Sequence, residues 1–193
     1  MITIKKTKKK IPLVLGLIGE AGSGKDTAAS YIKKKYNAEE FRFSYMLVNA
    51  LKILGIPISR QNLAWLADVL KKKYGNNVLT RAMEKTIKVL CQKPIIVING
   101  LRLPSDYDFI RRFPKNKVIF LTAPEKIRWK RVYVRHEKAD DKVPFEEFLR
   151  LSSGRNEKYI KKIGKKADYV VVNDGDIDKF YKAIDHILLS IKK

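Results

Sequence analysis

The stretch LGLIGEAGSGKDTAASYI, from Leu15 to Ile32, joins three kinds of local sequence. An apolar run comes first, a segment rich in glycine follows, and a helical pattern begins near Lys25. Glycines let the backbone adopt positive φ angles, so that its N–H groups close around an anion. The helix that follows directs the positive end of its dipole at the same point. The stretch therefore predicts a strand, an anion-binding turn and a helix.

The spacing Gly19-x-x-x-x-Gly24-Lys25 matches the P-loop, in which backbone N–H groups and a lysine hold nucleotide phosphates. The residue after the lysine is usually Ser or Thr, a magnesium ligand. Here Asp26 takes that place and Thr27 follows, so both are candidate ligands of Mg²⁺. Asp26 alternatively only stabilises the start of the helix through the dipole. The residues predicted to bind ATP in this loop are Gly19, Ala21, Gly22, Ser23, Gly24, Lys25, Asp26 and Thr27.

Apolar runs of strand length recur along the chain, and they are rich in β-branched residues. Such runs are typical of parallel strands buried on both faces. They are Leu13–Ile18, Phe41–Ser44, Ile95–Asn99, Val118–Thr122 and Tyr169–Asn173. Helical patterns separate them, at Thr27–Lys35, Tyr45–Leu54, Leu63–Tyr74, Val78–Leu90, Asp106–Arg112, Glu125–His136, Phe145–Ile163 and Ile177–Ile191. The alternation predicts a three-layer α/β fold with a five-stranded parallel sheet and helices on both faces.

The chain of 193 residues suits one domain, which we expect over residues 11–193 behind a basic, frayed tail at 1–10. Two inter-strand segments, about 45–93 and about 124–166, exceed what one crossover needs. Segments of this length in an open α/β sheet are usually functional, and ligands bind beyond the carboxyl ends of the strands.

Composition narrows the classes of function. With Cys91 as the single cysteine, and His136 and His186 as the only histidines, a disulfide framework within the chain and a His-rich metal site are not expected. No apolar run is long enough for a membrane helix and no signal-peptide core follows the basic start, so we expect a cytoplasmic protein. The net charge of +22 favours anionic partners, and the Lys-rich, Gln-poor composition also suits a thermophile.

The motif SGKDT resembles the nucleoside monophosphate kinases, in particular their deoxynucleoside monophosphate kinase and dephospho-coenzyme A kinase-like branches. The resemblance implies a P-loop fold with strand order 2-3-1-4-5, and transfer of the γ-phosphoryl group of Mg-ATP to a nucleotide-like acceptor. It also makes residues about 45–93 the acceptor-binding insertion and about 124–166 the lid. Within the insertion the polar candidates are Ser44, Arg60 and Arg81, and the aromatic ones are Trp65 and Tyr74.

Three further segments are similar to these kinases. In Asn99-Gly100-Leu101-Arg102, Arg102 would bind the acceptor phosphate, while Asn99 replaces the acidic residue at the strand end and leaves the acidic role to Asp26. On the helix after Thr122, Arg128, Arg131 and Arg135 share one face. The resemblance gives the first two the task of stabilising the transferring phosphoryl group, with Arg150 and Arg155 in the far arm. The loop with Asn173 and Gly175 would lie against adenine.

Other functions remain open at the level of sequence. A dephospho-coenzyme A kinase differs only in its acceptor. An RNA-associated P-loop ATPase would explain the charge and the Lys-rich tail, and its binding would weaken steeply with salt. A nucleotide-binding protein without turnover would explain Asn99. The sequence does not specify the acceptor or the oligomeric state.

Overall fold

The computed structural model describes residues 11–90, 92–135, 142–153 and 155–192. The basic tail, Cys91 and His136 lie outside the described residues, as do the side chains of Arg60 and Arg155. None of the described helices is long and apolar enough to cross a membrane.

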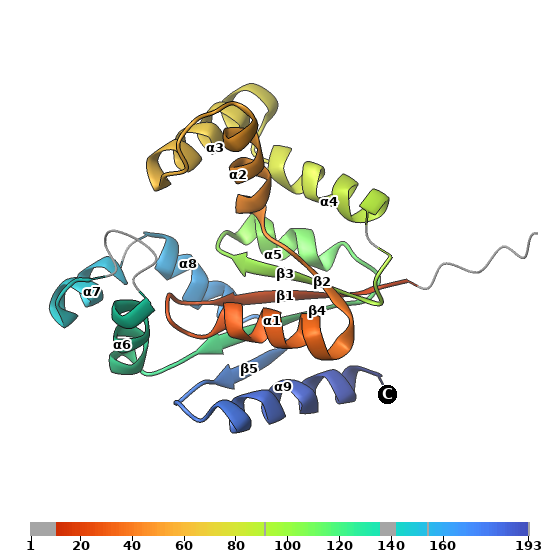
Figure 1. The fold of residues 1–193 in the computed structure, drawn as a ribbon. Helices are drawn as coiled ribbons and strands as arrows, with labels where there is room; N and C mark the ends of the chain where they lie inside the picture. The colour runs from red at the N-terminus through yellow and green to blue at the C-terminus, as the bar shows by residue number, and fades with distance from the viewer. Residues whose placement is uncertain (1–10, 91, 136–141, 154, 193) are drawn as a thin grey trace, which may run out of the picture.

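The centre of the fold is a five-stranded sheet in the order β2-β3-β1-β4-β5, with every neighbouring pair parallel. The predicted architecture and strand order are therefore confirmed. The strands are β1 (Leu13–Gly19), β2 (Ala38–Phe41), β3 (Ile95–Leu101), β4 (Asn116–Thr122) and β5 (Tyr169–Val172). β1 is central and almost wholly buried, because its apolar side chains face helices on both sides (Figure 1).

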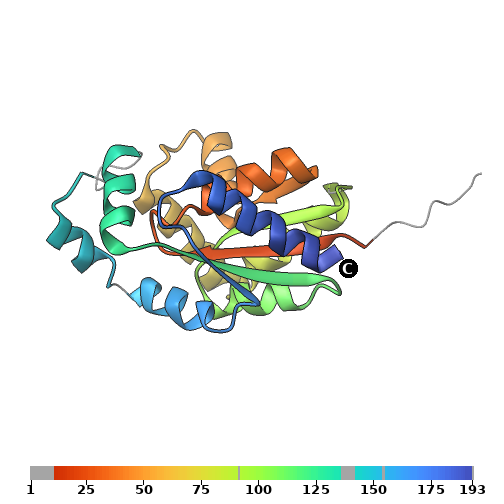
Figure 2. The same cartoon turned by 90° about the horizontal axis from the view of Figure 1, so that it is seen from below.

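Two hydrophobic clusters lie on opposite faces of the sheet. On one face α1 (Lys25–Tyr36) and α9 (Ile177–Lys192) pack on Leu15, Leu17 and Leu121, and α9 runs across the sheet in Figure 2. On the other face α4 (Val78–Leu90), α5 (Pro104–Arg111) and α8 (Arg155–Gly164) cover Val14 and Ile98. The alternation of β-strand and helix thus produces the expected three layers.

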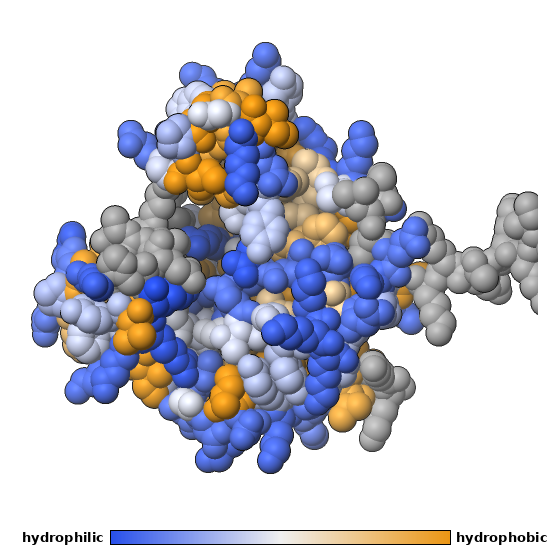
Figure 3. Space-filling view, in the orientation of Figure 1, coloured by the Kyte–Doolittle hydropathy of each residue, from blue (hydrophilic) through white to orange (hydrophobic). Residues whose placement is uncertain are grey.

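The segment between β2 and β3 forms three helices. α2 (Phe43–Ile53) and α3 (Arg60–Tyr74) share a small cluster of their own around Leu47, Leu51 and Leu66. Both rise above the sheet at the end where the P-loop lies (Figure 1). Several large apolar side chains of this pair are exposed and form the orange patch at the top of Figure 3; they include Ile53, Leu54, Ile58, Trp65 and Val69.

Two predicted elements are wrong in their bounds. The strand expected at Phe41–Ser44 ends at Phe41, and α2 already begins at Phe43. The real strand, AEEF, carries two glutamates because β2 is an edge strand, so it lacks the apolar run on which the prediction relied. The single helix expected at Phe145–Ile163 is interrupted: α7 (Phe145–Leu151) ends at Ser152, and α8 begins at Arg155. Serine competes with helical hydrogen bonds through its own side chain, and Ser153 Oγ donates to Arg150 O.

Candidate functional site

The loop between β1 and α1 has the backbone of an anion-binding turn. Gly22 and Gly24 have φ angles of 77° and 98°, and Gly24 is the residue that precedes the first turn of α1. A Cβ atom on Gly22 would lie 2.5 Å from the backbone oxygen of Arg128. Gly22 is therefore required twice, by its conformation and by the close approach of α6 (Glu125–Arg135).

Three side chains hold three consecutive carbonyl groups of this loop. Arg128 Nη1 lies 3.4 Å from the oxygen of Ala21, and Arg131 Nη1 lies 3.3 Å from that of Gly22. Asn173 Nδ2 donates to the oxygen of Ser23 at 3.1 Å. We call Arg128, Arg131 and Asn173 the loop clamp. Arg131 also donates to the Asn173 side chain at 2.9 Å, so the members of the clamp support one another.

The clamp determines which way the peptide groups point. In a trans peptide the C=O and the following N–H point in opposite directions, so holding a carbonyl outward turns the next N–H inward. The clamped carbonyls of Ala21 and Ser23 thus direct the N–H groups of Gly22 and Gly24 to the inside of the loop. The positive end of α1 faces the same space. Together these groups form a cradle for phosphate oxygens.

Arg128 is almost fully buried, with 2 % of its surface exposed. Its Nε donates to the oxygen of Ala123 at 3.2 Å, and its guanidinium lies 5.5 Å from the centre of the Phe148 ring in α7. Arg131 is half-buried, and its burial lowers the pKa of the guanidinium from its ordinary value. The structure therefore brings both arginines to the loop, but onto its backbone oxygens.

Lys25 lies at the first position of α1 and its Nζ donates to the oxygen of Glu20 at 2.7 Å. The side chain thus folds back over the loop to which it belongs. Because a lysine has a long flexible stem and three donors, it can exchange this carbonyl for a phosphate oxygen with little cost. This position is the one that the P-loop spacing predicts.

Asp26 belongs to a cluster of charges at the carboxyl ends of the neighbouring strands. Asn99 Nδ2 donates to Asp26 Oδ1 and to Glu40 Oε1, both at 2.9 Å. Arg42 Nη2 lies 2.7 Å from a carboxylate oxygen of each acidic residue. Arg135 is a second cation near Asp26, at 3.8 Å. We call Asp26, Glu40, Arg42 and Asn99 the strand-end cluster.

These contacts change the titration of Asp26. Burial raises the pKa of its carboxyl group, but the guanidinium of Arg42, the hydrogen bond from Asn99 and the charge of Lys25 together hold that pKa below its ordinary value. Asp26 therefore stays ionised at neutral pH and below. Its side chain is still 52 % exposed, so the charge is accessible from the loop side.

Sequence reasoning missed Glu40 and Arg42. The signal lies in the register: Phe41 pairs with Ile98, so Arg42 and Asn99 leave their parallel strands at the same level. The misplaced bounds of β2 concealed this, because they put Arg42 in the middle of a strand. Asn99 itself is buried, and an aspartate there would add a third carboxylate to a site that already holds two.

The remaining predicted residues lie around the same edge of the sheet. Thr27 is exposed in the first turn of α1. Arg102 follows β3 with an exposed side chain, and its backbone N–H donates to Asp106 Oδ2 at 2.9 Å. Gly175, with a φ of 133°, lies in the loop between β5 and α9.

The residues present fit a magnesium ion that arrives with a nucleotide. Such an ion keeps several waters and takes one or two carboxylates plus phosphate oxygens. Asp26 offers an accessible carboxylate, and the buried Asn99 Oδ1 has no hydrogen-bond partner among the described residues. In the same part of the chain no group of three or more His, Cys, Asp or Glu residues forms a metal cage. The donor set therefore suits a metal bound mainly by phosphate.

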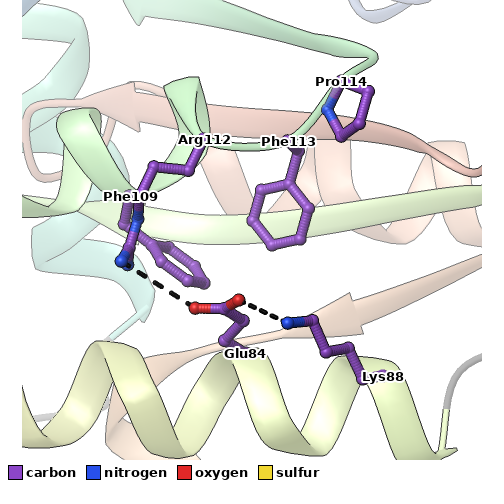
Figure 4. A pocket seen from close by; sticks show the side chains of 6 residues that line it. All are labelled: Glu84, Lys88, Phe109, Arg112, Phe113 and Pro114. Carbon is purple, nitrogen blue, oxygen red and sulfur yellow. Dashed lines mark hydrogen bonds and ion pairs between the residues drawn. The ribbon is translucent and has the colours of Figure 1, made fainter.

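A separate pocket of about 240 Å³ lies between α4 and α5, away from the P-loop. Its lining residues are Glu84, Lys88, Phe109, Arg112, Phe113 and Pro114. Glu84 lies between the two cations, 2.7 Å from Lys88 and 3.8 Å from Arg112 (Figure 4). Since its charged groups are paired with each other, this pocket lacks the convergent unpaired groups of the P-loop edge.

No family model matches the chain. It is 25% identical over 183 residues to a UPF0200 protein of Pyrococcus horikoshii, covering 93% of this chain and 97% of the relative. A UPF0200 protein of Methanocaldococcus jannaschii is 26% identical over 187 residues, with 93% and 90% covered.

Among solved structures, shikimate kinase from Bacteroides thetaiotaomicron superposes with a TM-score of 0.64 at 12% identity, covering 94% of this chain and 99% of the other. A gluconokinase from Sinorhizobium meliloti gives a TM-score of 0.54 at 12% identity, with 95% and 97% covered. The chain has the fold of these P-loop kinases.

Proposed function

We propose that this protein is an ATP-dependent phosphotransferase that moves the γ-phosphoryl group of Mg-ATP to a small acceptor. The observation that carries the proposal is the loop clamp, which fixes three consecutive P-loop carbonyls and turns the intervening N–H groups inward. Phosphoryl transfer depends on positioning and on positive charge, and a loop held in this way supplies both before the nucleotide arrives.

Each residue then has a distinct task. Lys25 exchanges the Glu20 carbonyl for the terminal phosphates of ATP, and Asp26 with Thr27 holds the metal that neutralises phosphate charge when bound. Arg102 binds the acceptor from the carboxyl end of β3. Asn173 and Gly175 form the loop against which adenine packs.

The arginines of α6 act on the loop and beside it. Arg128 is a positioning residue in this structure, because its buried guanidinium contacts only protein groups. The assignment of Arg128 and Arg131 to the transferring phosphoryl group stays a prediction. Arg131 is the better placed of the two, since it is only half-buried and borders both the P-loop and Asn173.

For the acceptor we propose a ribo- or deoxynucleoside monophosphate, bound between the strand-end cluster and the helices α2–α4, with residues about 124–166 as the lid. A dephospho-coenzyme A acceptor is the nearest alternative. Both are nucleotide-like molecules with an anionic group that would meet the cations at this edge, Arg42, Arg102 and Arg135.

The test is an assay of ADP formation with Mg²⁺ and ATP over a panel of acceptors: each ribo- and deoxynucleoside monophosphate, dephospho-coenzyme A, shikimate, gluconate, single-stranded RNA and none. One acceptor should stimulate turnover at least about 100-fold, and Lys25→Ala should abolish the stimulation. Lys34→Ala, an exposed lysine on the same helix, controls for the loss of one charge. A protein that hydrolyses ATP equally with every acceptor is not this kinase.

A second candidate, an RNA-stimulated ATPase, rests on the net charge of +22. RNA binding would weaken steeply with salt because bound counterions are released, whereas nucleotide held inside the loop would respond far less. Stimulation by RNA alone, with a steep salt dependence, would favour this candidate over the kinase.

A further inference from the structure

Arg42 is the most strongly oriented cation of the strand-end cluster. Its Nε donates to Glu40 Oε1 at 2.7 Å, and its Nη2 lies 2.7 Å from the same carboxylate. Glu40 is in turn held by Asn99, and its side chain is only 12 % exposed. A buried carboxylate that grips one edge of a guanidinium fixes its plane and leaves the other edge to face the site.

The second partner of Arg42 is of a different kind. Asp26 contacts Nη2 at 2.7 Å, but its side chain is 52 % exposed, whereas that of Glu40 is not. An ion pair between exposed groups contributes little to stability, so a stronger anion displaces it readily. A phosphate dianion carries more charge and more acceptor oxygens than a carboxylate. The contact with Asp26 is therefore exchangeable, while the contact with Glu40 is not.

The position of Arg42 decides which anion it meets. It leaves β2 at the level where Asn99 ends the buried part of β3, and its guanidinium lies 5.4 Å from the centre of the Tyr45 ring at the start of α2. Asp26 follows directly on Lys25, at the inner end of the donor phosphates. Arg42 thus lies between the P-loop and the segment α2–α4, on the acceptor side of the donor.

We propose that Arg42, oriented by Glu40 and Asn99, binds the phosphate group of the acceptor after releasing Asp26. This inference rests on the proposed kinase function and narrows its substrate class to small phosphomonoesters. Arg42 and Arg102 leave adjacent strands at the same edge of the sheet, so the two guanidiniums hold one phosphate from two sides. Glu40 is a positioning residue, because Arg42 and Asn99 occupy its oxygen Oε1.

The experiment separates the acceptor site from the donor site without relying on turnover. The protein is saturated with ADP in the presence of EDTA, which fills the P-loop, and inorganic phosphate is then titrated as the probe by calorimetry. Arg42→Ala should weaken phosphate binding on the order of 10- to 100-fold, the range expected for a charge-assisted hydrogen bond. Arg112→Ala is the matched control: it removes the same charge at the far end of α5, where Arg112 faces Glu84 (Figure 4).

Asp26→Asn tests the exchange itself. It should tighten phosphate binding, because Arg42 no longer has to leave a carboxylate, and the gain should vanish in the double variant Asp26→Asn/Arg42→Ala. If Asp26 acts only through its charge, Arg42→Ala will have the same effect in both backgrounds, and the proposed exchange is then wrong.

The outcomes remain distinct from those of the kinase test. Equal phosphate affinity in Arg42→Ala and Arg112→Ala overturns the role of Arg42 and leaves the kinase intact. Failure of ADP to bind the unaltered protein overturns both proposals. Melting curves check each variant for folding. If Arg42→Ala does not fold, Arg42→Lys carries the test: it keeps the charge but loses the fork that reaches Glu40 and phosphate together, so phosphate should bind roughly 3- to 10-fold more weakly.

Discussion

At the scale of single residues, Gly22 shows how closely the P-loop fits its surroundings. Its φ of 77° strains any residue with a Cβ, and that atom would also lie 2.5 Å from the oxygen of Arg128. Gly55 has a similar φ of 67°, but a Cβ there would meet nothing within 4 Å. The two glycines therefore separate the cost of the conformation from the cost of the clash.

We expect Gly55→Ala to lower the free energy of unfolding by about 1 kcal/mol, the cost of a left-handed residue. Gly22→Ala should lower it by about 1–3 kcal/mol more, because α6 must move away from the loop, and should also weaken ADP binding. Urea unfolding and calorimetry measure both effects. If the two variants are equally stable and Gly22→Ala binds ADP normally, the close contact between α6 and the loop is not real.

Asp185 is a second residue with a dense set of contacts, between α9 and α1. Its carboxylate accepts from Tyr36 Oη at 2.6 Å and from Tyr31 Oη at 2.9 Å, and it pairs with Lys35 at 2.7 Å. Burial, together with the hydrogen bond to Asp185, raises the pKa of Tyr36 to about 12. The folded state thus keeps the tyrosine proton beyond the pH at which an unfolded chain releases it.

This raised pKa predicts a loss of stability at alkaline pH. The contribution of Tyr36 is fully present below the tyrosine pKa of the unfolded chain, about 10, and disappears as the pH rises towards about 12. Tyr36→Phe should therefore be less stable than the unaltered protein at pH 8 but should lose less stability between pH 9 and pH 11. Tyr74→Phe, at an exposed site on α3, is the control. Parallel alkaline losses in all three proteins would contradict the assignment.

At the scale of elements, the loop clamp links four parts of the chain: the P-loop, α6, α7 and the loop after β5. Asn173 makes the link to β5, since its Nδ2 donates to Ser23 and its Oδ1 accepts from Arg131. It is 5 % exposed, so neither contact is replaced easily by water.

Asn173→Asp tests this link with the smallest change in shape. The carboxylate still accepts from Arg131, but its second oxygen faces the carbonyl of Ser23 and repels it. We expect ADP affinity to fall on the order of 10-fold, as is typical when a buried polar partner is lost. Asp174→Asn, at the exposed neighbour, should bind ADP at least as tightly as the unaltered protein. Normal ADP affinity in Asn173→Asp would remove Asn173 from the clamp.

At the scale of the whole molecule, 42 basic and 20 acidic residues leave a net charge of +22 on 193 residues. In Figure 3 hydrophilic residues cover most of the visible face outside the α2–α3 patch. Like charges at this density repel one another in the compact state more than in the expanded chain. The charge is thus a cost to the fold, whatever partner it serves.

Salt should therefore stabilise this protein. Because the Debye length falls from about 30 Å at 0.01 M to about 8 Å at 0.15 M, repulsion between distant surface charges is largely screened over this range. We expect the melting temperature to rise by several degrees between these salt concentrations, with sodium chloride and potassium chloride acting alike. A melting temperature that falls with salt would show that attractive pairs outweigh the net repulsion.

The sequence by itself determined the architecture and the donor site. The apolar runs of β1, β3 and β4 and the spacing from Gly19 to Lys25 are local signals, and they suffice because buried parallel strands and glycine turns impose residue types directly. The strand order followed from the resemblance that this loop carries.

Only the tertiary structure decided what the polar residues contact. Arg128 and Arg131 have the spacing of a helix face, but the packing of α6 against the P-loop turns them to backbone oxygens. Glu40 and Arg42 became part of the site because β2 pairs with β3 in a register that no local pattern contains. Hydrophobic periodicity encodes which side of an element is buried, whereas the partner of a charged group depends on atoms that are distant in sequence, and these meet only when the sheet has formed.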